Sequence, residues 1–287
     1  MTPASKLRAC EMRRAFTEEV TGPEGAMRVE YAALLIGAED EAAKEVEVSD
    51  YMARLDAWAE GARRVIANRS ESVTPVEAFN GFMFEGLGLA GNKSDYYDPR
   101  NSYLNEVMER RTGIPITLSI LYMAVGRRAG FEVKGVGLPG HFITRIREVE
   151  SRESTMVDPF HGKIIDRTDC QERLDEIYSG QVALRDEHLR ATSTPDILVR
   201  VLSNLKTIYA RAGLYRQALS AVERILLVKP HAAEELRERG AFLAQLNRLP
   251  EAIAYTAAYL QIAPDAPDAK ETLEQLKAMR RRHALLS

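Results

Sequence analysis

The stretch GIPITLSILYMAVGRRAGFEVKGVGLPGHFITRI, residues 113–146, decides the fold. Residues 114–128 are apolar on nearly every side, so they predict a helix buried at the centre of a domain. Three segments rich in β-forming residues follow, at 131–136, 141–146 and 155–157. Glycine and proline separate them, as is typical of short strands joined by tight turns. One buried helix against a short antiparallel sheet predicts an α+β domain.

The residues before this stretch predict helices rather than a sheet. Apolar residues recur at three- and four-residue steps over 51–66, which predicts an amphipathic helix capped by Ser49 or Asp50. The sequence TPVE at 74–77 is typical of a helix start, with threonine as the N-cap, proline in the first position and glutamate in the third.

The last third of the chain repeats itself. Residues 196–230 align with residues 230–264 at a shift of 34, which places Leu202 on Leu236 and the turn at Gly213 on the turn at Asn247. A helix–turn–helix period of this length, ending in proline, indicates tetratricopeptide repeats. Residues 268–286 predict a polar, arginine-rich helix that caps the stack, so we expect about five helices here.

These patterns divide the chain of 287 residues into three parts. We expect a helical lead-in over 1–29, the α+β domain over 30–192 and the repeats with their capping helix over 193–287. The boundary falls at the short TSTP segment, residues 192–195, which is not rich in glycine and serine as a flexible linker would be.

Composition narrows the function classes. Hydrophobic residues make up 45% and charged residues 28%, as in ordinary soluble globular proteins. The net charge of −3 gives no global basic footprint, so we expect no nucleic-acid partner. No apolar run reaches 18 residues and the first 19 lack the apolar core of a signal peptide, so we expect no membrane partner. Two widely separated cysteines favour a reducing, cytoplasmic location.

One pair of residues could carry chemistry. His141 follows Pro139-Gly140 on a predicted strand, and Asp158 ends the next segment rich in β formers. An imidazole and a carboxylate on neighbouring strands can form a hydrogen bond across the sheet, which is the base-and-orienter pair of a nucleophilic hydrolase. A structural histidine satisfied by the aspartate is the alternative interpretation.

The region from Gly91 to Phe160 resembles the transglutaminase-like family of SirB-type bacterial proteins, members of which commonly append tetratricopeptide repeats. The resemblance covers roughly 30–175 and 195–285. The pieces that carry it are Gly91-Asn92, Tyr97-Asp98-Pro99, Asn101-Ser102-Tyr103-Leu104, Arg110-Arg111, Gly113-Ile114-Pro115-Ile116, Leu118-Ser119, Leu121-Tyr122, Gly130, Gly135-Val136, Pro139-Gly140-His141-Phe142 and Asp158-Pro159-Phe160.

The resemblance implies a helix-rich, papain-like α+β domain followed by an all-α repeat domain. It also implies a cysteine at the start of the central helix, a histidine on one strand and an aspartate on the next. His141 and Asp158 match the second and third roles, but the family offset from Gly130 places Pro115 where the cysteine belongs. Proline has no nucleophilic group, so this chain departs from active transglutaminases at the decisive position.

Other residues could stand near that position. The hydroxyl of Thr117 needs an adjacent base to attack, and in the first turn of a helix it more often bonds to the backbone. Cys170 also begins a predicted helix, but it follows the sheet, which is the wrong chain order for this family. Asn101 and Ser102 are expected to cap the next helix, or alternatively to line the His141 cleft.

A metal site is the weakest of these interpretations. His141, Asp158 and His161 supply two imidazoles and a carboxylate, a donor set that iron and zinc sites use. The spacing of Asp158 and His161 is not a recognised metal pair, so the sequence predicts no metal and no other cofactor.

Three functions remain open. The first is a non-catalytic, regulatory interaction protein, in which a degenerate transglutaminase-like domain carries a repeat tail that binds a protein or peptide partner. The second is a peptidase- or amidase-like acyl-transfer hydrolase that uses His141 and Asp158 with an unassigned nucleophile or an activated water. The third is a cleft that binds a small ligand without chemistry.

Overall fold

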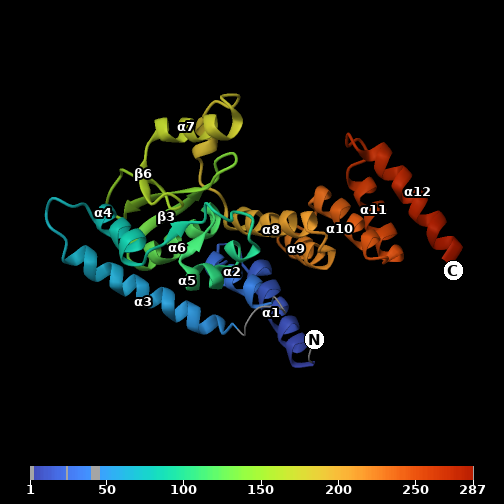
Figure 1. The fold of residues 1–287 in the computed structure, drawn as a ribbon, viewed down its shortest axis with the longest axis horizontal. Coiled ribbons are helices and arrows are strands. Elements are labelled where there is room, and N and C mark those ends of the chain that lie inside the picture. Colours follow the sequence, from blue (N-terminus) through green and yellow to red (C-terminus); the bar gives the residue numbers. More distant parts are fainter. Residues whose placement is uncertain (1–2, 24, 40–45, 287) are drawn as a thin grey trace. The chain divides into compact units, whose positions relative to one another are not determined.

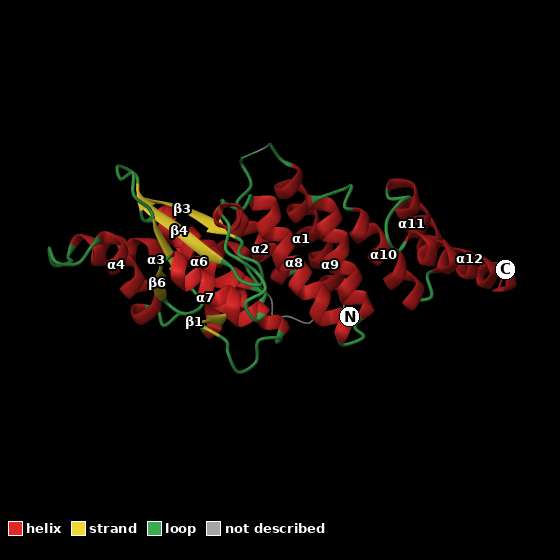
Figure 2. Cartoon of the chain, turned by 90° about the horizontal axis from the view of Figure 1, so that it is seen from above, coloured by secondary structure: helices red, strands yellow, loops and turns green. Residues whose placement is uncertain are grey.

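A computed structural model describes residues 3–23, 25–39 and 46–286. The chain splits into two compact units, one up to Ile197 and one from Leu198 onward (Figure 1). In the described part of the chain all strands belong to the first unit, and the second unit is built from helices (Figure 2).

The first unit contains both helices and strands. Its helices are α1 (Pro3–Thr21), α2 (Val29–Ala38), α3 (Val48–Ala67), α4 (Pro75–Asn80), the π-helix η1 (Gly81–Gly86), the 3-10 helix η2 (Pro99–Asn101), α5 (Leu104–Arg110), α6 (Pro115–Arg128), α7 (Arg167–Tyr178) and the 3-10 helix η3 (Asp186–Leu189). Its strands are β1 (Ala90–Gly91), β2 (Thr112–Gly113), β3 (Phe131–Val136), β4 (Ile143–Glu148), β5 (Thr155–Asp158) and β6 (Lys163–Ile165).

Helix α6 is the centre of this unit. Every residue from Pro115 to Gly126 is buried, and the helix packs against α3 and against strands β3 and β4. Tyr122 shows how completely it is enclosed, because its ring lies 4.8 Å from that of Phe79 and its hydroxyl donates to Oδ1 of Asn80 at 2.7 Å. The near-uniform apolar character of this segment is therefore explained by neighbours on all sides.

The main sheet has four antiparallel strands in the order β3-β4-β5-β6. Strand β3 has the predicted bounds, and β5 ends at Asp158. The sequence predicts His141 on a strand, but this prediction is wrong. Strand β4 starts at Ile143, and His141 lies in the turn before it. The turn includes His141, because Gly140 has φ +70° and the N–H of His141 bonds back to the Leu138 carbonyl at 3.1 Å.

Helix capping follows the prediction at one site and departs from it at another. Thr74 accepts from the backbone N–H of Glu77, and the Glu77 carboxylate accepts from the backbone of Thr74, which completes the expected capping box at α4. Helix α3 starts at Val48 with Glu47 at the N-cap position and no side-chain cap, so neither Ser49 nor Asp50 caps it.

The second unit is the expected stack of helices. They are α8 (Thr194–Arg211), which begins just before the unit boundary, α9 (Tyr215–Val228), α10 (Ala233–Gln245), α11 (Leu249–Ile262) and α12 (Ala269–Leu286). The turns of the two repeats are equivalent in conformation, because Gly213 has φ +70° and Asn247, its partner 34 residues later, has φ +58°. Glycine and asparagine are the residues that tolerate this left-handed region.

Candidate functional site

His141 and Asp158 meet at one end of the sheet. The backbone N–H of His141 donates to the Leu138 carbonyl at 3.1 Å, which fixes the turn before β4. Strands β4 and β5 pair with Thr144 opposite Val157, and this register brings the last residue of β5 beside that turn. Nε2 of His141 lies 2.8 Å from Oδ2 of Asp158, and both residues are buried.

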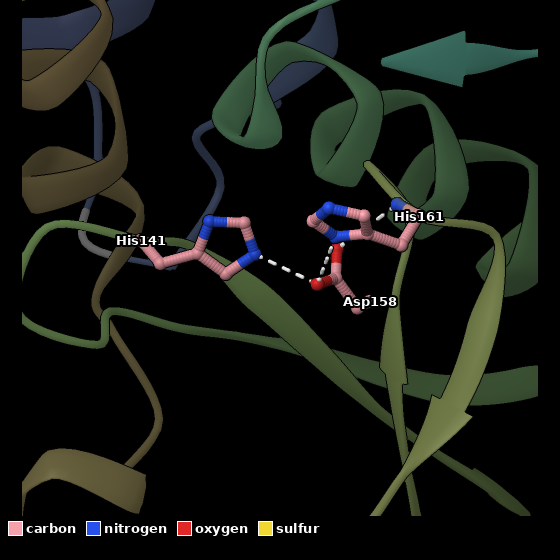
Figure 3. A group of neighbouring side chains, drawn as sticks. All are labelled: His141, Asp158 and His161. Atoms are coloured by element: carbon pink, nitrogen blue, oxygen red, sulfur yellow. Dashed lines mark hydrogen bonds and ion pairs between the residues drawn. The ribbon is translucent and has the colours of Figure 1, made fainter. Parts of the chain in front are cut away.

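A second imidazole reaches the same carboxylate. Nδ1 of His161 also lies 2.8 Å from Oδ2 of Asp158, so the two histidines bracket one oxygen (Figure 3). The other oxygen, Oδ1, accepts from the backbone N–H groups of Phe160 at 2.9 Å and His161 at 3.3 Å. The turn that follows β5 therefore orients the carboxylate through its own backbone.

These contacts hold Asp158 as an anion. Burial alone would raise the pKa of its carboxyl, but the hydrogen bonds and charges of His141 and His161 outweigh burial and lower the pKa to about 2. Because an anionic Oδ2 can only accept, the ring nitrogen that faces it donates. In neutral His141 that leaves a lone pair on Nδ1, the atom that a general base needs.

His161 is less buried than His141. Burial is the main cause that lowers its pKa, Asp158 works in the opposite direction, and the nearby cation of Arg173 adds to the lowering. Nη2 of Arg173 lies 3.3 Å from Nδ1 and 3.4 Å from Nε2 of His161. The cation is itself paired with Glu176 at 2.5 Å. A lowered pKa favours the neutral imidazole near pH 7.

Aromatic rings close the same end of the sheet. The ring of Phe160 lies 6.2 Å from that of His141 and 4.9 Å from that of His161, both edge to face. The Tyr96 ring lies 6.3 Å from Phe160. Strand β1 adds a backbone contact, because the N–H of Gly91 donates to the Phe160 carbonyl at 3.1 Å.

The start of α6 carries no nucleophile. Pro115 is the first residue of the helix and is buried. The hydroxyl of Thr117 accepts from the N–H of Ile114 at 3.2 Å and donates to the carbonyl of Asn101 at 2.8 Å, so it serves the backbone. The Ser119 side chain is fully buried in the same helix.

The sequence predicts that Asn101 and Ser102 cap the next helix, but neither side chain caps α5. That helix begins at Leu104 with Tyr103 at the N-cap position and no side-chain cap, and it is Asp98 that caps the short helix η2. Asn101 is buried and organises the loop instead, because its amide donates to the Asp95 carbonyl at 2.7 Å. The Ser102 hydroxyl is buried without a hydrogen-bond partner among the described residues.

Both cysteines are free thiols. Cys170, near the start of α7, is buried in an apolar cluster with Val136, Leu138 and Ile143. Burial, followed by the negative charges of Asp169 and Asp158, raises the pKa of its thiol to about 11. Burial and neighbouring carboxylates therefore keep the Cys170 thiol from forming a reactive thiolate at neutral pH. Cys10 is exposed on α1.

The prediction of a hydrogen-bonded His141–Asp158 pair did not include His161. The sequence signal was present, since His161 follows Asp158 by three residues at a strand end, but the spacing alone does not show that the turn folds the imidazole back onto the carboxylate. Nδ1 of His161 lies at hydrogen-bond distance from Oδ2 only because that turn closes.

The family model described as the transglutaminase-like superfamily matches residues 49–203, which is more than half of the chain. The chain belongs to the transglutaminase-like superfamily. A tetratricopeptide repeat model matches residues 205–277, so the expected order of a transglutaminase-like domain and helical repeats is confirmed. Among the described residues, no helix of this superfamily member is long and apolar enough to cross a membrane.

Its relatives include bacterial and mammalian proteins. A UPF0162 protein from Xylella fastidiosa is 38% identical over 192 residues, which are 65% of this chain and 67% of that protein. F-box only protein 21 of Mus musculus is 28% identical over 188 residues, 61% of this chain but 29% of the F-box protein. A crystal structure of menin covers 93% of this chain and 73% of the menin chain at a TM-score of 0.39 and 10% identity, a likeness too weak to support an argument.

Proposed function

We propose that this protein is a non-catalytic, regulatory interaction protein. Its transglutaminase-like domain retains the histidine and the aspartate of a catalytic triad, and its repeat unit binds a segment of a protein partner. The observation that carries the proposal is Pro115, which is the first residue of α6, the position where the family resemblance implies a cysteine. Without a thiolate at that helix end, an acyl-enzyme cannot form there.

The other candidate nucleophiles support the same conclusion. Thr117 uses its hydroxyl to join Ile114 and Asn101. The Cys170 thiol is buried with its pKa raised to about 11 by burial and by neighbouring carboxylates, so it is protonated at neutral pH. Free thiols at Cys10 and Cys170 also fit the reducing cytoplasm in which we place the protein.

The second unit offers a groove for a partner. Helices α10 and α12 line a concavity of about 660 Å³, to which α8 and α11 contribute one residue each. The apolar part of its lining consists of Ala210, Ala241, Phe242, Ala244, Ala278 and Met279. Polar groups beside it include Glu271 and Gln275. This combination suits a peptide segment that inserts apolar side chains and pairs its polar groups at the edge.

Selection of peptides from a displayed random library on the full-length chain tests the groove. We expect enriched peptides to bind with micromolar dissociation constants, and Ala241→Arg, which fills the exposed part of the groove, to weaken binding at least tenfold. Ala254→Arg is the matched control, because Ala254 is exposed on α11 outside the groove. Equal binding by the Ala241→Arg variant, or no enriched peptide, would refute the proposed groove.

The absence of acyl-enzyme chemistry has its own test. The wild-type chain and His141→Ala are each treated with fluorophosphonate and iodoacetamide probes. We expect the two proteins to be labelled equally. Labelling of a residue at the start of α6 that disappears in His141→Ala would contradict a non-catalytic role.

A hydrolase that uses an activated water is the second candidate. It is favoured by the 2.8 Å contact between Nε2 of His141 and Asp158, which is the base-and-orienter geometry of a hydrolase. Hydrolysis of an amide or ester that is lost in His141→Ala, while circular dichroism shows a native fold, would favour this candidate over the first.

A further inference from the structure

We propose that His141, Asp158 and His161 form a binding site for one divalent transition-metal ion, for which zinc is the best match. The proposal is independent of the repeat groove. It rests on three donor groups that the fold brings together, although the Asp158–His161 spacing in sequence gave no reason to expect it.

The three donors converge on one small volume. One ligand atom of each residue lies within 4.8 Å of the others. Oδ2 of Asp158 lies 2.8 Å from both Nε2 of His141 and Nδ1 of His161 (Figure 3). Zinc bonds of about 2.0–2.2 Å in a tetrahedron place neighbouring ligand atoms roughly 3.3 Å apart. An ion can therefore enter with side-chain shifts of about 1 Å or less. The ring nitrogens that face Oδ2 give up their protons when the ion binds, and these protons move to the outer ring nitrogens or leave to solvent.

The carboxylate is already oriented for this role. Its Oδ1 accepts two backbone N–H groups, from Phe160 and His161, and that leaves Oδ2 directed at the imidazoles. Hydrogen bonds to the outer atom of a ligating carboxylate are the usual support of a metal site, because they fix the direction of the inner atom. The support here comes from backbone, so it does not depend on further side-chain rotamers.

The donor types select the class of ion. Two imidazole nitrogens and one carboxylate oxygen suit zinc and its first-row neighbours, whereas calcium and magnesium prefer oxygen ligands alone. Three protein ligands leave a fourth tetrahedral position for water. His161 is only partly buried, with 20% of its side chain exposed, and it is the part of the cluster that solvent reaches.

One neighbour opposes a cation. Nη2 of Arg173 lies 3.3 Å from Nδ1 of His161 and carries a positive charge, although Glu176 pairs with it at 2.5 Å. The guanidinium must swing away when the ion enters. Arg173 is partly exposed on α7, so this movement is open to it. Arg173→Gln is therefore expected to tighten binding rather than weaken it.

Calorimetric titration of the full-length, tag-free chain with zinc, after treatment with a chelator and dialysis, tests the site. We expect one equivalent to bind with a dissociation constant of about 1 μM or lower. His161→Ala removes one of three ligands at a partly exposed turn position, and we expect it to weaken binding at least tenfold while circular dichroism stays native. Cobalt in place of zinc should give the visible absorption of a four-coordinate site.

The remaining histidines provide the control. His188, His231 and His283 lie elsewhere in the chain, so the triple variant H188A/H231A/H283A should keep the full equivalent of zinc. The proposal is overturned if the wild-type chain takes up no stoichiometric zinc, or if His161→Ala binds it as well as the wild type. Either result would mean that the three residues form a hydrogen-bonded cluster and nothing more.

Discussion

The Thr117 hydroxyl donates to the carbonyl of Asn101 at 2.8 Å and accepts from the N–H of Ile114 at 3.2 Å. One buried side chain therefore joins the end of η2 to the first turn of α6. Thr117 and Asn101, two residues that the sequence offered as cleft lining, bond to each other's segments at this point.

Replacing Thr117 by valine should destabilise the protein. The change leaves a buried carbonyl and a buried N–H without their partner, which costs about 1 to 3 kcal/mol. Urea unfolding followed by circular dichroism measures the loss. Thr117→Ser keeps the hydroxyl and should retain most of the stability, so equal losses in both variants would point to packing of the methyl group instead.

The Asp98 carboxylate should make stability depend on pH. Burial alone would raise its pKa, but the side chain and backbone of Arg100 and the charge of Arg110 bring the pKa below the ordinary value. A carboxyl with a lower pKa in the folded state contributes stability that is fully present above its unfolded pKa of about 3.9 and is lost as pH falls through the folded pKa.

Asp98→Asn should therefore lower the free energy of unfolding by about 1 kcal/mol at pH 7, because Arg100 is exposed and water screens part of the attraction. The difference from wild type should shrink below about pH 4, as urea unfolding at a series of pH values would show. The exposed Glu153→Gln serves as a control that should behave like wild type throughout. If the difference in free energy of unfolding between Asp98→Asn and wild type grew toward acid pH, it would contradict a lowered pKa for Asp98.

The two cysteines should differ sharply in reactivity. Cys10 is exposed, whereas Cys170 is buried with its pKa raised to about 11 by burial and by nearby carboxylates. A disulfide reagent that releases a coloured thiolate should titrate one thiol in the native chain at pH 7.5 and the second only after denaturation. Fast reaction of native Cys10→Ser would show that Cys170 is accessible and would restore it as a candidate nucleophile.

Gly91 should not accept a side chain. A Cβ atom there would lie 2.6 Å from the carbonyl oxygen of Phe160, a backbone atom that cannot turn aside. We expect Gly91→Ala to cost about 1 to 3 kcal/mol in urea unfolding, because β1 or the turn after β5 must shift. Gly81→Ala is the control, since a Cβ atom there meets nothing within 4 Å. Similar losses in both variants would locate the cost in backbone conformation rather than contact.

The sequence by itself determined the elements whose patterns are local. The apolar segment at 114–128 predicts α6 because a helix apolar on all sides can only be buried. The 34-residue repeat and the polar segment after it predict helices α8–α12, and the equivalent turn residues Gly213 and Asn247 share a left-handed conformation. Thr74 and Glu77 predict the start of α4 because a capping box is complete within four residues.

The contacts that the buried polar side chains of the site make were decided by the tertiary structure. The sequence predicts that His141 and Asp158 can pair, but not that His161 shares the same oxygen, because that contact depends on how the turn after β5 closes. Asn101 and Thr117 likewise meet across 16 residues of chain, at a distance in sequence that no helix or strand period encodes. Local patterns specify which element a residue joins, whereas the partner of a buried polar group depends on how those elements pack.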